Sequence, residues 1–182
     1  MDEGKPSSTA LIVAMSRAVH LHCDDDPKVF ADPLAMQLCG YETVDALRAG
    51  FEALQESLVR RSPEFGALYV RDGLARMLMR QRYAEDELAE AVKRGLGQYV
   101  ILGAGLDSFA YRRTDLARDL HVFEVDHPAT QQWKRSRLKA LNLPAPANLT
   151  FVPVDFERQT LEQGLSGCGY RVDQPAFFPG SE

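Results

Sequence analysis

The chain has 182 residues, of which 45% are hydrophobic and 26% are charged, and its formal net charge is −5 at pH 7. A chain of this size and composition can bury a core as one domain with a helical extension. The acidic balance excludes a nucleic-acid-binding protein that is held by phosphate contacts. No apolar run has the length of a membrane span, and the polar start MDEGKPSSTA is unlike a secretory signal.

The cysteines are scattered and odd in number: Cys23, Cys39 and Cys168. Secreted small proteins instead carry even sets of cysteines at regular spacings, which form disulfide frameworks. We therefore expect free thiols and a cytoplasmic protein.

Helical periodicity dominates the first half of the chain. The sequence predicts helices over residues 9–22, 30–38, 44–60 and 67–95, after a short polar tail. Gly95 and Gly97 follow the last and longest of these helices and end it. We therefore expect residues 1–95 to form an N-terminal helical extension or lid.

Strands and helices alternate after Gly97. The sequence predicts strands over residues 99–102, 121–126 and 149–154, with a helix within 108–120 and another from Pro128 to 142. This alternation predicts a parallel sheet with right-handed crossovers, so we expect an α/β, Rossmann-like doubly wound domain over residues 96–182.

Residues 98–109, QYVILGAGLDSF, combine a buried strand with a glycine turn. Gly103 and Gly105 let the backbone turn sharply and leave room for a ligand beside the main chain. Asp107 places a carboxylate at this turn. Because doubly wound folds bind ligands at the carboxyl ends of their strands, we expect a nucleoside-type cofactor here. The alternative is a loop that needs only positive φ angles.

Acidic residues follow three of the predicted strands: Asp107, Asp126 and Asp155. The carboxyl ends of parallel strands share one edge of a sheet, so we expect these side chains to line one crevice. Asp126 lies about twenty residues past the glycine turn, where an acid can accept hydrogen bonds from both ribose hydroxyls. Carboxylates repel phosphates, and Ser108 stands where a dinucleotide-binding turn has its third glycine. A cationic cofactor with a ribose is therefore favoured over the NAD of a dehydrogenase, which is the alternative.

These motifs together resemble a known family. ILGAGLDSFAYR, FEVDHP and FVPVDF are similar to the class I S-adenosylmethionine-dependent methyltransferases of the leucine carboxyl methyltransferase family. TALIVAMSRAVH, DDDPKVFADPLA and RQRYAEDELAEAV are similar to the N-terminal segments of its bacterial, largely actinobacterial branch. The resemblance covers most of residues 9–178. It implies S-adenosylmethionine as cofactor and a small-molecule substrate that is methylated on oxygen or on a carboxyl group.

The resemblance also implies a set of cofactor-binding residues: Arg17, Arg82, Gly103, Gly105, Asp107, Asp126, Asp155 and Phe156. Asp126 would hold the ribose hydroxyls, and Asp155 and Phe156 would contact the adenine. The two glycines would bring the backbone close to the methionine part, whose carboxylate would pair with Arg82, with Arg17 near the same end. The resemblance assigns no catalytic residue.

Other conspicuous side chains receive structural interpretations. His20 and His22 lie two residues apart, on different faces of a helix, so no metal site is expected. Lys134 and the three basic residues that follow it on the same predicted helix indicate a solvated face, not a nucleic-acid patch. His127, next to the expected ribose acid, is also expected to be structural.

The C-terminal segment departs from the family pattern. Residues 174–178 predict the beginning of a fourth strand, which Pro179 interrupts. We therefore expect a C-terminally incomplete sheet. One hypothesis is a methyltransferase; the other is a truncated, non-catalytic remnant that keeps part of the cofactor site. An incomplete sheet exposes an apolar edge, which favours a homo-oligomer or a completing partner chain.

Overall fold

The computed structural model describes residues 7–61, 63 and 66–179, and the structural statements below concern these residues. The first half is helical, as predicted, with α1 Ser8–Cys23, α2 Ala35–Cys39, α3 Val44–Arg61 and α4 Gly66–Lys93. Among the residues described, no helix is both long enough and apolar enough to cross a membrane.

The predicted helix over residues 30–38 is wrong in its first half, because α2 begins only at Ala35. Pro33 disfavours helical backbone at the residue before it. The side chain of Asp32 also accepts a hydrogen bond from the Leu34 backbone N–H at 3.1 Å, which holds a turn here. The segment before α2 is therefore shaped by side-chain contacts.

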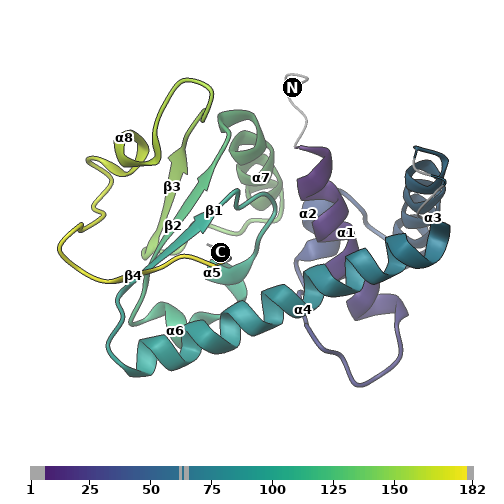
Figure 1. The fold of residues 1–182 in the computed structure, drawn as a ribbon, viewed down its shortest axis with the longest axis horizontal. Coiled ribbons are helices and arrows are strands. Elements are labelled where there is room, and N and C mark those ends of the chain that lie inside the picture. The colour runs from purple at the N-terminus through teal and green to yellow at the C-terminus, as the bar shows by residue number, and fades with distance from the viewer. Residues whose placement is uncertain (1–6, 62, 64–65, 180–182) are drawn as a thin grey trace.

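The second half is a parallel α/β unit, as predicted (Figure 1). Its elements are β1 Gln98–Leu102, α5 Phe109–Arg112, α6 Thr114–Ala117, β2 His121–Asp126, α7 Pro128–Ala140, β3 Leu149–Pro153, α8 Leu161–Leu165 and β4 Ala176–Phe177. The strand order is β3-β2-β1-β4, and every pairing is parallel. This is the Rossmann-like arrangement that the alternation of elements predicts. The predicted fourth strand is present, but it pairs with β1 over only two residues.

Two details differ from the predictions. The single helix expected within residues 108–120 is two short helices, α5 and α6, which meet at Arg113. Helix α8 lies in a segment for which no element was predicted. Its first turn is closed by a capping box between Thr160 and Gln163, a local signal that is readable in the sequence.

The sheet separates two cores. On one face, Tyr99, Ile101 and Val122 pack with Leu88 of α4 and Phe109 of α5. On the other face, the buried residues come from the three longer strands, from the residue after β3 and from α8: Val100, Phe123, Val125, Val152, Val154 and Leu165. Strands that are covered on both sides need apolar residues at nearly every position, which explains the continuous apolar runs in the sequence.

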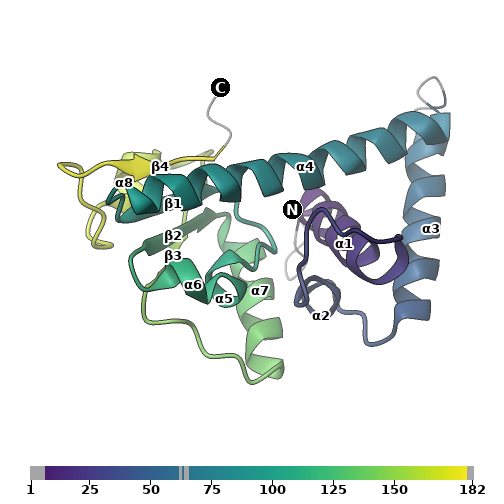
Figure 2. The same ribbon diagram turned by 90° about the horizontal axis from the view of Figure 1, so that it is seen from below.

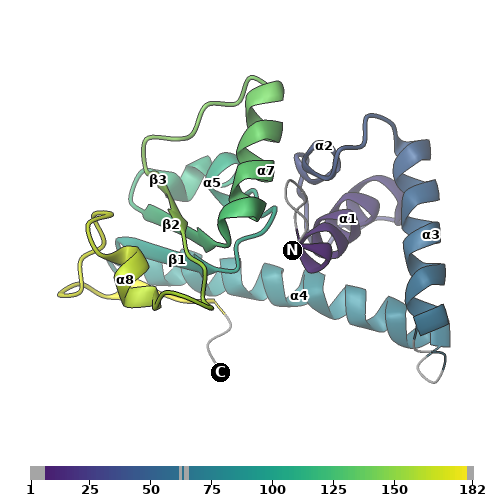
Figure 3. The same ribbon diagram turned by 90° about the horizontal axis from the view of Figure 1, so that it is seen from above.

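Helix α4 connects the sheet to the N-terminal helices. Figures 2 and 3 show α1, α2 and α3 gathered at one end of α4, with the sheet at the other. The core of these helices includes Ala14, Leu38 and Leu47, and it continues to Leu106 after β1 and Leu138 of α7. The indole N–H of Trp133 on α7 donates to the Leu38 carbonyl at 3.3 Å. This packing places α1 beside the turn that follows β1.

Candidate functional site

The turn after β1 requires glycine at two positions. Gly103 has φ 63° and Gly105 has φ 55°, a region that residues with a Cβ rarely adopt. A Cβ at Gly103 would meet no atom within 4 Å, whereas one at Gly105 would meet the Ala10 Cβ at 3.0 Å. The turn is therefore open at Gly103, but α1 covers it at Gly105. At Gly105, the group that closely approaches the backbone is therefore helix α1 and not a ligand.

Asp126 connects the end of β2 to the glycine turn. Its Oδ2 accepts a hydrogen bond from the Gly105 backbone N–H, and its Oδ1 accepts one from the His127 N–H at 2.6 Å. The Ala104 N–H donates to the Val125 carbonyl at 3.1 Å. The expected ribose acid and the glycine turn, 21 residues apart, are thus held in direct contact.

Asp155 follows β3 at the same edge of the sheet. The Val154 N–H donates to the Asp126 carbonyl at 2.9 Å, which holds the ends of β2 and β3 together. The Asp155 carboxylate accepts from the Glu157 N–H at 3.1 Å and lies 3.6 Å from Arg158. The next side chain, Phe156, is 57% exposed. The sheet therefore carries a row of carboxylates at its carboxyl edge, as expected from the topology.

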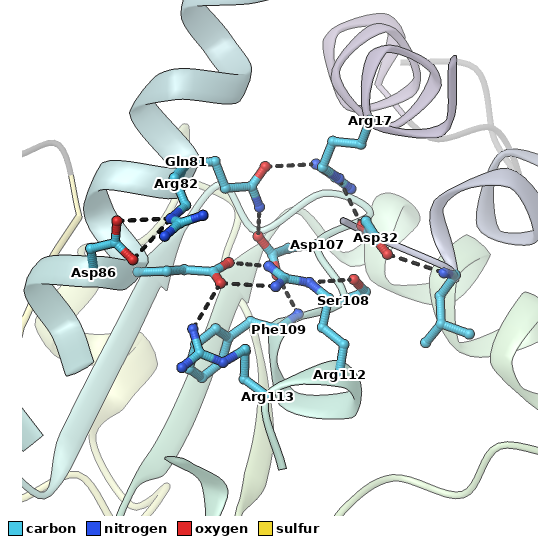
Figure 4. Close-up of polar contacts among 12 residues, drawn as sticks. Arg17, Asp32, Gln81, Arg82, Asp86, Asp107, Ser108, Phe109, Arg112 and Arg113 are labelled. Carbon is cyan, nitrogen blue, oxygen red and sulfur yellow. Dashed lines mark hydrogen bonds and ion pairs between the residues drawn. The ribbon is translucent and has the colours of Figure 1, made fainter. Parts of the chain in front are cut away.

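Asp107 is held from two directions (Figure 4). Its Oδ1 accepts from the Phe109 backbone N–H at 2.6 Å, which starts α5, and its Oδ2 accepts from Gln81 Nε2 of α4 at 2.7 Å. Gln81 was not among the predicted site residues. Helical spacing could have found it, because it lies seven residues after Leu74 and three after Leu78, on the apolar face of the predicted helix.

Arg17 lies beside the turn, but its charge is already neutralised. The guanidinium is 3% exposed, and its Nε donates to Asp32 Oδ2 at 2.8 Å. It also donates to the Leu106 carbonyl at 2.7 Å and to Gln81 Oε1 at 3.3 Å. Because Asp32 is fully buried, this pair is shielded from water. Arg17 thus joins α1, α4 and the turn.

Arg82 points away from this group in Figure 4. It is more than half exposed, and its Nε lies 2.9 Å and 2.8 Å from the two carboxylate oxygens of Asp86. It also donates to the Val29 carbonyl at 3.2 Å. Within the described part of the chain, these contacts do not join Arg82 to Asp107 or Arg17. The structure therefore brings six of the eight predicted residues to the glycine turn and the strand ends beside it. Arg17 is buried against the turn, where it donates to the Leu106 carbonyl, and Arg82 lies apart.

Glu85 anchors α4 to the helix that follows the glycine turn. Its carboxylate is 6% exposed and pairs with Arg112 of α5, and it lies 3.3 Å from Arg113. The Arg112 guanidinium also stacks 4.4 Å from the centre of the Phe30 ring. Sequence analysis did not single out Glu85. Its buried carboxylate fixes α4 relative to α5, and Gln81 is carried by the same helix one turn earlier.

A buried ion pair lies under α7, and it corrects the prediction of a solvated face at Lys134, whereas Arg135 and Lys139 are exposed as predicted. Lys134 donates to Glu124 Oε2, and both side chains are only 1% exposed. Gln131, Lys134 and Leu138 are all buried, so this face of α7 packs on the sheet. The Glu124 Oε1 has no hydrogen-bond partner among the described residues. Burial raises the pKa of Glu124 from its ordinary value near 4.5 to about 7, although Lys134 opposes the shift.

Glu124→Gln is expected to flatten the pH dependence of stability. The folded-state pKa is about 7 and the ordinary value about 4.5, so the folded protein binds more protons than the unfolded chain between these pH values. The contribution of this carboxyl to the free energy of unfolding therefore falls as the pH rises through that window. Urea titrations at about pH 5 and about pH 8 measure how the free energy of unfolding changes with pH. The exposed Glu157→Gln is the control, and an unchanged slope in Glu124→Gln contradicts the prediction.

His20 and His127 make contacts that hold loops and helix ends of the fold. His20 Nδ1 lies 2.7 Å from Asp24, and its Nε2 accepts from the Val29 N–H at 3.0 Å, which closes the loop after α1. His127 Nδ1 accepts from the Ala129 N–H at 3.2 Å and caps α7. Among the described residues, no group of three or more His, Cys, Asp or Glu side chains could hold a metal ion.

Comparison with known proteins agrees with this geometry. The family model for leucine carboxyl methyltransferase matches residues 10–180. The chain belongs to the leucine carboxyl methyltransferase family. The predicted resemblance to this family is confirmed, and so is the α/β fold.

Its relatives in this family are longer than the chain. It is 38% identical to "Putative S-adenosyl-L-methionine-dependent methyltransferase YktD" of Bacillus subtilis (strain 168), covering 97% of this chain and 61% of that protein. It is 34% identical to a "Putative S-adenosyl-L-methionine-dependent methyltransferase" of Mycobacteroides abscessus, covering 94% of this chain and 54% of the relative. A protein of the same name from Mycolicibacterium paratuberculosis is 30% identical, with 94% and 54% coverage. The chain thus spans between half and two thirds of these relatives.

Proposed function

We propose that this chain binds S-adenosylmethionine at the carboxyl edge of its sheet and acts as a methyltransferase. Family membership and the printed names of its relatives support this function. The observation that carries the proposal is the position of Asp126 at the glycine turn. Two backbone N–H groups hold its carboxylate, one oxygen each. A carboxylate has about four lone-pair sites, so two are left for the ribose hydroxyls.

The surroundings of Asp126 fit the rest of this cofactor. Gly103 has open space where a side chain would stand, so a ligand can approach the backbone there. Leu102 is 42% exposed and Phe156 57% exposed, although both are large apolar residues at strand ends. A purine would cover such surface, and the Asp155 carboxylate would accept from its exocyclic amine.

The methionine carboxylate is assigned to Arg82 in this proposal. Arg82 points away from Asp107 in this structure, so its side chain would have to turn toward the site as it exchanges its exposed partner Asp86 for the carboxylate of the cofactor. Exposed ion pairs contribute only about 0–1 kcal/mol, so this exchange costs little. Arg17 is a weaker candidate because it is buried and already paired with Asp32.

The bound cofactor would supply an activated methyl group on a sulfonium. The chain would position this methyl group and exclude water, as such transfers need mainly orientation and desolvation. We infer O-methylation of a small molecule, with a carboxylate as the favoured acceptor. A carboxylate is already ionised at neutral pH and attacks without a general base, whereas an alcohol or phenol profits from one.

Asp126→Ala is expected to weaken binding of S-adenosylhomocysteine by about 10- to 150-fold. This range corresponds to about 1.5–3 kcal/mol for hydrogen bonds to a charged group. Isothermal titration calorimetry measures the loss, with the exposed Asp119→Ala at the opposite end of β2 as the matched control. Asp126→Asn keeps an acceptor for the Gly105 N–H and separates loss of charge from distortion of the turn. Unchanged affinity in Asp126→Ala, or tight binding of NAD alone by the unmodified chain, contradicts the proposal.

The alternative is a non-catalytic chain that keeps the cofactor site. This alternative rests on the partial coverage of the relatives, of which the chain spans 61% and 54%. Single-turnover assays with labelled S-adenosylmethionine and a panel of carboxylic acids distinguish the two. Methyl transfer establishes the enzyme; binding without transfer, alone or with an added partner chain, supports the alternative.

A further inference from the structure

We propose that Gln81 is a positioning residue that directs the Asp107 carboxylate at the cationic end of the cofactor. This inference rests on the proposed function. Two neighbouring side chains, Arg17 and Asp107, determine the orientation of the Gln81 amide. Arg17 can only donate, so it faces Oε1 at 3.3 Å, and the Asp107 carboxylate can only accept, so it faces Nε2 at 2.7 Å.

The Gln81 amide separates a cation from an anion. Without it, the guanidinium of Arg17 and the carboxylate of Asp107 would be free to pair directly. As arranged, Arg17 is neutralised by the buried Asp32. Gln81 carries no charge, so it leaves the negative charge of Asp107 in place at the turn.

Arg112, a second cation near Asp107, is also paired with a carboxylate. Arg112 donates to both carboxylate oxygens of Glu85 and to the Ser108 hydroxyl, the latter at 3.1 Å. Figure 4 shows Arg112 on one side of Asp107 and Arg17 with Asp32 on the other. The turn therefore presents a carboxylate that is held by two neutral N–H donors, from Gln81 and Phe109. Such a group suits the α-ammonium of an amino-acid ligand, because no ion pair among the described residues neutralises the negative charge of Asp107.

The position of Gln81 also couples this carboxylate to the N-terminal helices. Gln81 belongs to α4, Arg17 to α1 and Asp107 to the turn after β1, and the two hydrogen bonds of the amide span all three. Glu85, one helical turn later, holds the same helix against α5. A change at Gln81 is therefore expected to affect the amino-acid end of the ligand and to spare the ribose and adenine.

Two ligands test whether Gln81 affects only the amino-acid end of the cofactor. S-adenosylhomocysteine carries the amino-acid part, whereas 5′-methylthioadenosine has the same adenosine and thioether without it. Gln81→Met keeps the length of the side chain but removes both hydrogen bonds. Gln81→Glu keeps an acceptor for Arg17 but places a second carboxylate against Asp107. The exposed Gln132→Leu on α7 is the control. Calorimetry gives the affinity of each variant for each ligand.

We expect Gln81→Met and Gln81→Glu each to weaken binding of S-adenosylhomocysteine by about tenfold, the lower end of the loss for a hydrogen bond to a charged group. Affinity for 5′-methylthioadenosine should stay within about twofold of the unmodified chain. Equal losses for both ligands would show a merely structural role and overturn the inference, as would unchanged affinity for both. If the unmodified chain binds neither ligand, the proposed function itself fails; if Asp126→Ala weakens both ligands while the Gln81 variants weaken neither, only this inference fails.

Discussion

Replacement of Lys134 by methionine is expected to lower the free energy of unfolding by about 3–5 kcal/mol at about pH 8. The substitution removes the ammonium that donates to Glu124 and leaves an unpaired carboxylate in the core. The second carboxylate oxygen already has no partner among the described residues, so no other contact compensates. Urea denaturation measures the change.

The exposed Lys139→Met on the same helix is the matched control, with an expected effect within about 0.5 kcal/mol. The loss in Lys134→Met should shrink as the pH falls, because a protonated Glu124 no longer needs a cation. Joint replacement of Glu124 and Lys134 by methionine should recover most of the stability, since an apolar pair avoids the desolvation of two charges. A loss of less than about 1 kcal/mol in the single variant would contradict the burial of this pair.

Asp32→Ala is expected to destabilise the protein by a similar amount, about 3–5 kcal/mol. Asp32 is fully buried and is the carboxylate that pairs with the guanidinium of Arg17. Its removal leaves a buried cation whose other partners among the described residues are neutral, namely the Leu106 carbonyl and the Gln81 amide. It also removes the acceptor for the Leu34 N–H that shapes the segment before α2.

The exposed Asp25→Ala, in the loop after α1, serves as the control for Asp32 and should have little effect. The stability of Asp32→Asn should lie between those of Asp32→Ala and Asp25→Ala, because the amide oxygen still accepts hydrogen bonds but carries no charge. Thermal or urea unfolding measures all three variants. Equal stability of Asp32→Ala and Asp25→Ala would show that Arg17 is solvated or finds another anion, and would overturn the assigned ion pair.

Local sequence patterns were enough to predict the fold and to bring the strand-end acids to one edge of the sheet. The apolar run before Gly103 predicts a strand that is buried on both faces, and β1 confirms it. The parallel topology then follows from alternation of elements, and it brings the ends of β1, β2 and β3 to one edge whatever the side chains are. The contact between Asp126 and the glycine turn was therefore predictable, because chain order and strand order together determine it.

What the amino-acid sequence determined by itself is thus the alternation of elements, the glycine turn and the acids at the strand ends, since each depends on neighbours close in the chain. Only the tertiary structure decided which polar side chains are buried and which partners they contact. The sequence places Lys134 on a solvated face, but the packing of α7 on the sheet buries it against Glu124. Likewise, Gln81 and not its neighbour Arg82 contacts Asp107. The partners of Arg17 include Leu106, 89 residues away. Periodicity shows that a residue faces inward, but the charge it meets there comes from another element, and only packing brings the two together.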